Sequence, residues 1–137
     1  MSIKLSTVLL VLSIACAGTA QEPRQVATTG VVASGSLDAR SFEITLAREG
    51  EEPWGDTLAV TAGSFASLAC AEYGFGPATY TTDDEGDALA FRSTTTSDTE
   101  GTAVWRGRAR GETLEGTMVW TRPGEAPLTY TFRGTAL

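Results

Sequence analysis

The last quarter of the chain, residues 102–137, constrains the fold most, because its turns predict the register of three consecutive β-strands. The Arg110–Thr113 segment, Arg-Gly-Glu-Thr, has glycine at the first central position of a two-residue loop, as a type II′ hairpin turn requires. If Arg110 faces Thr113, then Trp105 faces Met118 across the hairpin. The same register pairs Gly107 with Gly116 and Ala103 with Trp120.

A second turn contains Pro123 and Pro127, and two prolines exclude a continuous ladder of hydrogen bonds through that segment. Pairing Arg122 with Leu128 on either side of this turn gives the register of the third strand. Side chains alternate between the two faces of a strand, so one face of this sheet becomes apolar and the other polar. The expected layers of the apolar face join Trp120 to Tyr130, Met118 to Phe132, and Gly116 to Gly134.

Five further short strands are expected upstream, at residues 41–46, 57–61, 64–69 or 64–70, 79–82 and 88–95, with no helix between them. A meander of short strands with one apolar face is expected to close on itself, because closure removes the unpaired edges. We therefore predict an all-β fold, a single eight-stranded antiparallel up-and-down β-barrel. The alternative is an open sheet or a β-sandwich.

Three glycines, Gly107, Gly116 and Gly134, are expected to face one another inside the barrel. Inward glycines let strands bend at barrel corners, which favours closure. They leave two interpretations open. The space above them is either an apolar cavity that accepts a guest, or it is filled by a phenylalanine from the far wall, namely Phe42, Phe65 or Phe91.

Residues 1–20 resemble an export signal, with Lys4 ahead of an apolar run from Leu5 to Ile14 that is too short to span a membrane. Two processing sites compete: one follows Gly18-Thr19-Ala20, and the other precedes Cys16, which ends a segment that resembles a bacterial lipobox. Residues 21–36 are small and polar and are expected to be flexible, which leaves 37–137 as the folded domain. We expect a periplasmic or secreted protein, or alternatively an outer-membrane lipoprotein anchored through Cys16.

The charge and the absence of histidine exclude several functional classes. The chain carries 17 acidic and 10 basic residues, a formal net charge of −7, and it has no histidine. So acidic a chain is not expected to bind nucleic acid or an anionic membrane surface. Without histidine it lacks the commonest general base, the commonest zinc ligand and every Ser-His or Cys-His nucleophile pair. We therefore expect no enzymatic activity, no catalytic residue, no metal and no cofactor.

Cys70 and the aromatic loop that follows it have two interpretations. Tyr73 and Phe75 could form a lid over the barrel mouth beside an exposed thiol. The interpretation that we favour is a buried cysteine acting as a small apolar side chain, with the two aromatic residues plugging the end of the barrel. Because no cationic residue stands nearby in the sequence, we expect no reactive thiolate.

Two charged stretches also have a functional and a structural interpretation. Asp83–Asp87, Asp-Asp-Glu-Gly-Asp, is more typical of a solvated hairpin turn than of a calcium loop, because its glycine and glutamate do not fall at the required spacing. Arg106, Arg108 and Arg110 share the outer face of one strand. They form either a basic recognition patch or, as we favour, cross-strand ion pairs with acids such as Glu115.

The chain resembles the calycin group of lipocalin-like and avidin-like barrels. Trp105-Arg106-Gly107, followed by Trp120 and Gly124, is similar to the Trp-x-Gly and Trp strand pair of avidins. Leu114–Thr117, Leu-Glu-Gly-Thr, resembles a late strand of small bacterial lipocalin-like domains. The chain departs from lipocalins at its first strand, which has no Gly-x-Trp, and from avidins at its end, which has no Asp-x-Phe. The resemblance implies a small barrel that holds an apolar ligand.

Two functional hypotheses follow. The first is an exported, non-enzymatic barrel that binds a small apolar or amphipathic ligand in its interior. Its expected ligand-binding residues are Trp105, Trp120, Tyr130, Phe132 and Met118 in the wall, with Tyr73 and Phe75 as the lid. The second is a structural or interaction module of the cell envelope with a solid core and no ligand.

Overall fold

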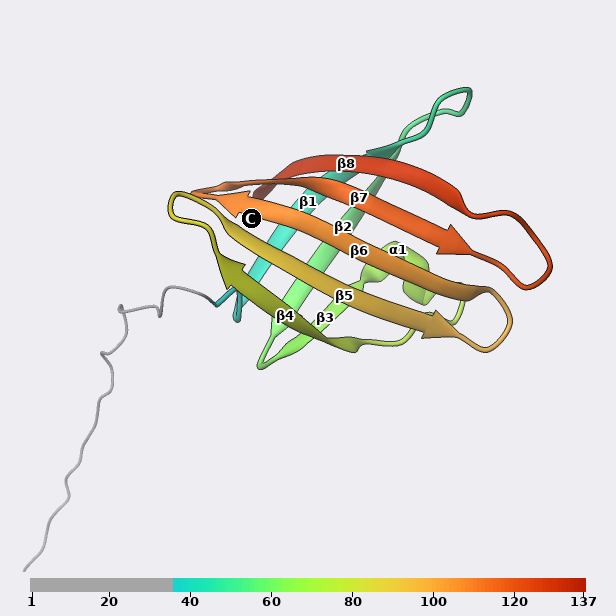
Figure 1. The fold of residues 1–137 in the computed structure, drawn as a ribbon, viewed down its shortest axis with the longest axis horizontal. Helices are drawn as coiled ribbons and strands as arrows, with labels where there is room; N and C mark the ends of the chain where they lie inside the picture. Colours follow the sequence, from blue (N-terminus) through green and yellow to red (C-terminus); the bar gives the residue numbers. More distant parts are fainter. Residues whose placement is uncertain (1–35) are drawn as a thin grey trace, which may run out of the picture. The chain divides into compact units, whose positions relative to one another are not determined.

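The computed structural model describes residues 36–137, which form a closed barrel of eight antiparallel strands (Figure 1). Each strand pairs with its neighbours in the sequence, and β1 pairs with β8 to close the barrel. The predicted up-and-down barrel is therefore confirmed. The elements are β1 (Arg40–Ala47), β2 (Trp54–Thr61), β3 (Ser64–Ser67), α1 (Leu68–Ala71), β4 (Ala78–Asp84), β5 (Leu89–Ser97), β6 (Gly101–Arg110), β7 (Thr113–Thr121) and β8 (Leu128–Ala136).

The expected export signal at 1–20, Cys16 within it, and all but the last residue of the 21–36 segment lie outside the described residues. Within residues 36–137, no helix has the length and apolar character needed to cross a membrane.

The predicted register of the β6–β7 hairpin is confirmed. Trp105 pairs with Met118, and Gly107 pairs with Gly116. Gly111 has a φ of +57°, whereas Glu112 keeps a negative φ, which is the combination that defines a type II′ turn. The two-residue turn therefore fixes the register, as its sequence predicts.

The predicted register of β7 and β8 is wrong by two residues. The tight turn is Arg122–Glu125, closed by a hydrogen bond of 3.1 Å from the Glu125 amide to the Arg122 carbonyl, with Gly124 at a φ of +75°. Ala126 and Pro127 then lengthen the loop before β8 begins. An even shift keeps every side chain on its predicted face but changes its partner. The observed pairs are Trp120 with Leu128, Met118 with Tyr130, Gly116 with Phe132, and Leu114 with Gly134.

The expectation of a strand through residue 69 or 70, and of no helix, is also wrong. β3 ends at Ser67, and one helical turn, α1, follows it. The Ser67 hydroxyl accepts a hydrogen bond from the Cys70 amide at 3.1 Å, which caps the helix. The buried Asp56 carboxylate accepts bonds from the Ser67 hydroxyl and from the Ala69 amide, the latter at 2.8 Å. This carboxylate on β2 therefore fixes α1 against the barrel wall.

Four aromatic rings form a closed layer across the barrel interior, which we call the aromatic layer. Its members come from β3, β5, β6 and β8, and each ring contacts two others at centroid distances of 5.5–6.4 Å. Their side chains are at most 4 % exposed. Edge-tilted contacts of this kind stabilise a core beyond the effect of burial alone. The members are Phe65, Phe91, Trp105 and Phe132.

The space above the facing glycines is filled by this layer. A Cβ atom at Gly107 would lie 2.6 Å from the Phe91 ring, and one at Gly116 would lie 2.7 Å from the Phe132 ring. Of the two interpretations of the glycines, the structure shows the packed one, but the rings come from neighbouring strands and not from the far wall: Phe91 pairs with Gly107, and Phe132 pairs with Gly116. Backbone limits the space as well, because a Cβ at Gly116 would collide with the Arg106 carbonyl oxygen and one at Gly134 would collide with the Glu43 carbonyl oxygen.

The barrel end beyond the glycines is sealed. Leu37, at the expected start of the domain, is 1 % exposed, and its amide donates to the Tyr80 hydroxyl at 3.3 Å. That hydroxyl donates to the Asp38 carboxylate at 2.6 Å. The Arg40 guanidinium lies 4.9 Å from the centre of the Phe42 ring and donates to the Gly111 carbonyl. The residues that close this end therefore come from the segment before β1 and from neighbouring turns.

We expect Gly116→Ala to destabilise the barrel by about 1–3 kcal/mol or more, because its methyl group has no room beside the Phe132 ring and the Arg106 carbonyl. Gly55→Ala is the matched control, since a Cβ there meets only the Ile44 carbonyl at 3.8 Å. It should change stability by less than about 0.5 kcal/mol. Urea unfolding followed by circular dichroism measures both. Equal stabilities of the two variants would contradict the packed glycine layer.

Candidate ligand pocket at the barrel mouth

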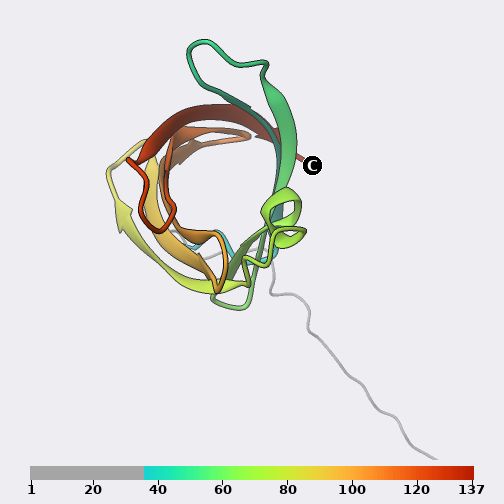
Figure 2. The same ribbon diagram turned by 90° about the vertical axis from the view of Figure 1, so that its right-hand side faces the viewer.

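The opposite end of the barrel holds a pocket of about 430 Å³. Figure 2 looks onto this end, where α1 and the β5–β6 and β7–β8 loops surround the rim. Five of the lining residues are large aromatic side chains: one each from β2, β7 and β8, and two from the segment after α1. The lining residues are Trp54, Ala69, Cys70, Glu72, Tyr73, Phe75, Glu100, Ala103, Met118, Trp120, Arg122 and Tyr130.

The structure gathers most of the predicted ligand-binding residues around this pocket and leaves two outside it. Trp120, Tyr130, Met118, Tyr73 and Phe75 all line it. The other two predicted residues, Trp105 and Phe132, belong to the aromatic layer deeper in the barrel and do not line the pocket. Met118 pairs with Trp105 and with Tyr130, so it lies between the aromatic layer and the pocket.

Trp54 is a pocket residue that lies outside the strand predicted at 57–61. β2 begins at Trp54 instead of Thr57, and the Trp54 ring meets the Tyr130 ring edge-on at 6.1 Å and 77°. The signal for this longer strand is present in the sequence. Trp54 stands two residues before the buried Asp56, in phase with the inward positions Leu58 and Val60.

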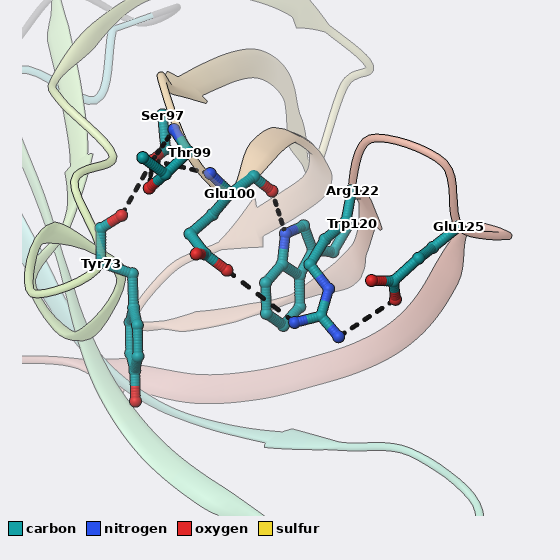
Figure 3. Close-up of polar contacts among 7 residues, drawn as sticks. All are labelled: Tyr73, Ser97, Thr99, Glu100, Trp120, Arg122 and Glu125. Atoms are coloured by element: carbon teal, nitrogen blue, oxygen red, sulfur yellow. Dashed lines mark hydrogen bonds and ion pairs between the residues drawn. The ribbon is translucent and has the colours of Figure 1, made fainter.

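Arg122, Glu100 and Trp120 form a polar group on the rim (Figure 3). The Trp120 indole donates to the Glu100 carbonyl at 2.7 Å, which holds the ring against the β5–β6 turn. The Arg122 guanidinium lies 4.8 Å from the centre of the Trp120 ring. Its two terminal nitrogens lie 3.8 Å from Glu100 and 3.1 Å from Glu125. These contacts fix the orientation of the indole and balance the arginine charge.

The segment after α1 forms one side of the mouth. Phe75 is 5 % exposed and meets the Trp120 ring edge-on at 6.4 Å, so it is part of the packed wall. Tyr73 is 63 % exposed at the rim, and its carbonyl accepts a hydrogen bond of 2.8 Å from the Ser97 hydroxyl (Figure 3). The two aromatic residues that we expected to act together therefore differ: Phe75 is fixed inside, while the Tyr73 ring is free at the surface.

The interior wall along β5 is polar near the mouth, which the alternation of strand residues does not reveal. Ser93, Thr95 and Ser97 are buried on the inward face of β5. Each is hydrogen-bonded: Ser93 donates to the Thr79 carbonyl at 2.8 Å, and Thr95 accepts from the Trp105 indole at 3.3 Å. These bonds fix the aromatic layer and leave the wall without free hydroxyl donors for chemistry.

Two titratable side chains at the pocket have raised pKa values. Burial raises the pKa of the Cys70 thiol, so the group is neutral at physiological pH. Burial, followed by the nearby Glu51 carboxylate, also raises the pKa of Tyr130, whose hydroxyl donates to Glu51 at 3.3 Å. Among residues 36–137, no three metal-binding side chains lie together. The arrangement can hold a small molecule by aromatic contact and hydrogen bonding.

Comparisons with protein-family models, with curated proteins and with solved structures found no match to this chain.

We expect Cys70 to react slowly with a neutral maleimide at pH 7, more than about tenfold slower than in the urea-unfolded chain, because burial lowers both access and thiolate content. The matched control is the double variant Leu68→Cys, Cys70→Ser, which places the thiol at an exposed position of the same helix, since Leu68 is 51 % exposed. Both proteins also carry Cys16→Ser, so that each contains a single thiol. Similar labelling rates of the two folded variants would show that α1 does not protect Cys70.

Proposed function

We propose that this chain binds a small apolar or amphipathic molecule in the pocket at the barrel mouth. The observation that carries the proposal is the position of Trp54, Tyr73, Trp120 and Tyr130 around one hollow, at the only end of the described barrel that the aromatic layer and Leu37 do not fill. Binding needs no catalytic group, and we propose a non-enzymatic role.

The dimensions and the lining of the pocket suit this role. Its volume of about 430 Å³ falls in the range of roughly 300–1,000 Å³ that is typical of small-molecule sites. Aromatic side chains bring large apolar area with little conformational freedom to lose. Carboxylates from Glu72 and Glu100 and the Arg122 guanidinium stand at the rim, where a polar end of the ligand would remain in water. An amphipathic ligand fits this distribution better than a purely apolar one.

The cellular setting and the family are further parts of the proposal. An export signal at 1–20 is supported by its sequence pattern, and the closed up-and-down barrel is compatible with a calycin-like origin. We propose a periplasmic or secreted protein, or a lipoprotein anchored through Cys16. Nucleic acid and anionic membrane surfaces are not proposed as partners, because the chain has a net charge of −7.

Binding of the uncharged fluorescent probe N-phenyl-1-naphthylamine tests the proposal. The wild-type protein should enhance its fluorescence saturably. Ala103→Leu, at a buried pocket residue, should weaken binding by about tenfold or more, because the larger side chain occupies the pocket. Ala59→Leu makes the same change outside the pocket, on β2, and should leave the affinity within about twofold.

A rim variant covers the case in which Ala103→Leu fails to fold. Tyr73→Ser removes an exposed ring and should leave stability unchanged while weakening the probe about two- to tenfold. Absence of saturable binding to the folded wild type, or equal affinities in all four proteins, would overturn the proposal. That result would favour the second hypothesis, a structural module without a ligand.

A further inference from the structure

The outer surface of the barrel wall carries a second hollow, of about 1080 Å³, which the proposed function does not use. It extends over the outward faces of β4 to β8 and the end of β1, and Pro53 borders it from the β1–β2 loop. Its lining combines four arginines and four threonines with two carboxylates, Asp83 and Glu115, and with apolar groups that include the Phe91 and Phe132 rings. The principal side chains are Arg92, Arg106, Arg108, Arg133, Thr117 and Thr131.

Three of the four arginines of this hollow differ from the other described arginines in having no ion pair. Residues 36–137 contain eight arginines, and five of them lie within 4.0 Å of a carboxylate. Among the described residues, Arg92, Arg106 and Arg133 have no such partner, and all three line the hollow. The expected pairing of the β6 arginines is therefore met in part: Arg108 pairs with Glu85 at 2.7 Å and Arg110 with Glu115 at 3.6 Å, while Arg106 stays without a carboxylate.

Arg92 on β5 and Arg106 on β6 stand directly opposite each other on the outer face. Like charges in opposite positions of a sheet repel and reduce stability. The nearest acidic residues on this face lie two residues farther along the strands. Glu115 of β7 forms an ion pair with Arg110, and Asp83 of β4 faces Ala90. The two guanidinium groups therefore leave two positive charges side by side, without a carboxylate partner, on this face.

On the strands that flank β5 and β6, the residues paired with the two arginines are threonines, whose hydroxyls can donate hydrogen bonds. Thr81 of β4 pairs with Arg92, and Thr117 of β7 pairs with Arg106, so four neighbouring strands present two guanidinium groups flanked by hydroxyls. Two forked guanidinium groups match the charge and the many acceptor oxygens of a doubly charged tetrahedral oxyanion. Arg133 lies on β8, where it faces Glu115 of β7, and it is about 12 Å from Arg106 along the diagonal of two strand spacings and two residues, within reach of a larger ligand.

We propose that this outer hollow is a binding site for a phosphate group, held between Arg92 and Arg106, on a small molecule that extends toward Arg133. The site is independent of the mouth pocket and lies on the opposite side of the barrel wall. The net charge of −7 disfavours long polyanions, so a small phosphorylated molecule or free phosphate is the expected source.

Titration with sodium phosphate and with glucose 6-phosphate, at constant ionic strength set by sodium chloride, tests the proposal. The Nε–Hε signals of arginine side chains report binding by NMR. Saturable shifts of Arg92 and Arg106 are expected, without a matching shift of Arg40. Tighter binding of glucose 6-phosphate than of free phosphate assigns the ligand to phosphorylated molecules, and the reverse order assigns it to phosphate itself. Shifts that do not saturate, or that affect all arginines alike, would overturn the site.

Charge-matched variants separate a site from general electrostatic attraction. Arg92→Gln and Arg106→Gln should each weaken phosphate binding by tenfold or more. Arg110→Gln, on the outer face of the same strand as Arg106, should change it less than threefold. Equal losses in all three variants would contradict a local site. Ala103→Leu should bind phosphate as the wild type does, which keeps this test separate from that of the mouth pocket.

Thermal unfolding without phosphate distinguishes a binding role of these arginines from a structural one. Because Arg92 and Arg106 repel each other in the free protein, Arg106→Gln should unfold at the wild-type temperature or above it. Added phosphate should raise the midpoint of the wild type and not that of the variant. A lower midpoint for Arg106→Gln in phosphate-free buffer would show that the arginine stabilises the fold, and would overturn the proposal.

Discussion

The aromatic layer is the constraint on which the rest of the barrel depends. Four rings from four strands contact one another in a closed circuit, and they need glycine at 107 and 116, because a side chain at either position would collide with a ring. The circuit ties together strands that are distant in sequence, and it divides the interior in two. Below it, Leu37 seals the barrel; above it, the wall opens into a pocket. Because the layer lies between the two ends, this small barrel combines a densely packed core with a pocket at one end.

Both ends of the barrel combine apolar packing with hydrogen bonds between separate elements. At the mouth, Asp56 of β2 holds α1 through the Ser67 hydroxyl and the Ala69 amide, and the Glu100 carbonyl in the β5–β6 turn holds the Trp120 indole. At the other end, the Tyr80 hydroxyl of β4 bonds to Leu37 and Asp38. The bonds at the mouth hold the pocket walls in place in the free protein. For the proposed ligand, such a preformed pocket would lose less conformational entropy on binding than one that the ligand must order.

Much of this architecture could be predicted from the sequence, and the failures have physical causes. Alternation identified the strands and their inward faces, and the Gly111 turn fixed one register, because both signals are local. The helical turn at α1 cannot be predicted by periodicity, because it has only four residues; its Ser67 cap is local, but the Asp56 carboxylate that holds the turn comes from another strand and meets it only in the fold. The alternation of residues along a strand also predicts whether a side chain points inward or outward, but not how far along the barrel axis it lies. Trp105 and Trp120 share the inward face of the sheet, yet one lies in the core and the other at the pocket.

The central claim is that the aromatic layer separates a packed end from a ligand-accessible mouth. Intermolecular NOEs from bound N-phenyl-1-naphthylamine to assigned side chains of the protein test it most directly. We expect NOEs to the Met118 methyl group and to the Trp120 and Tyr130 rings, and none to Leu37, which seals the end beyond the aromatic layer. NOEs to Leu37, or to outward-facing residues alone, would contradict this separation.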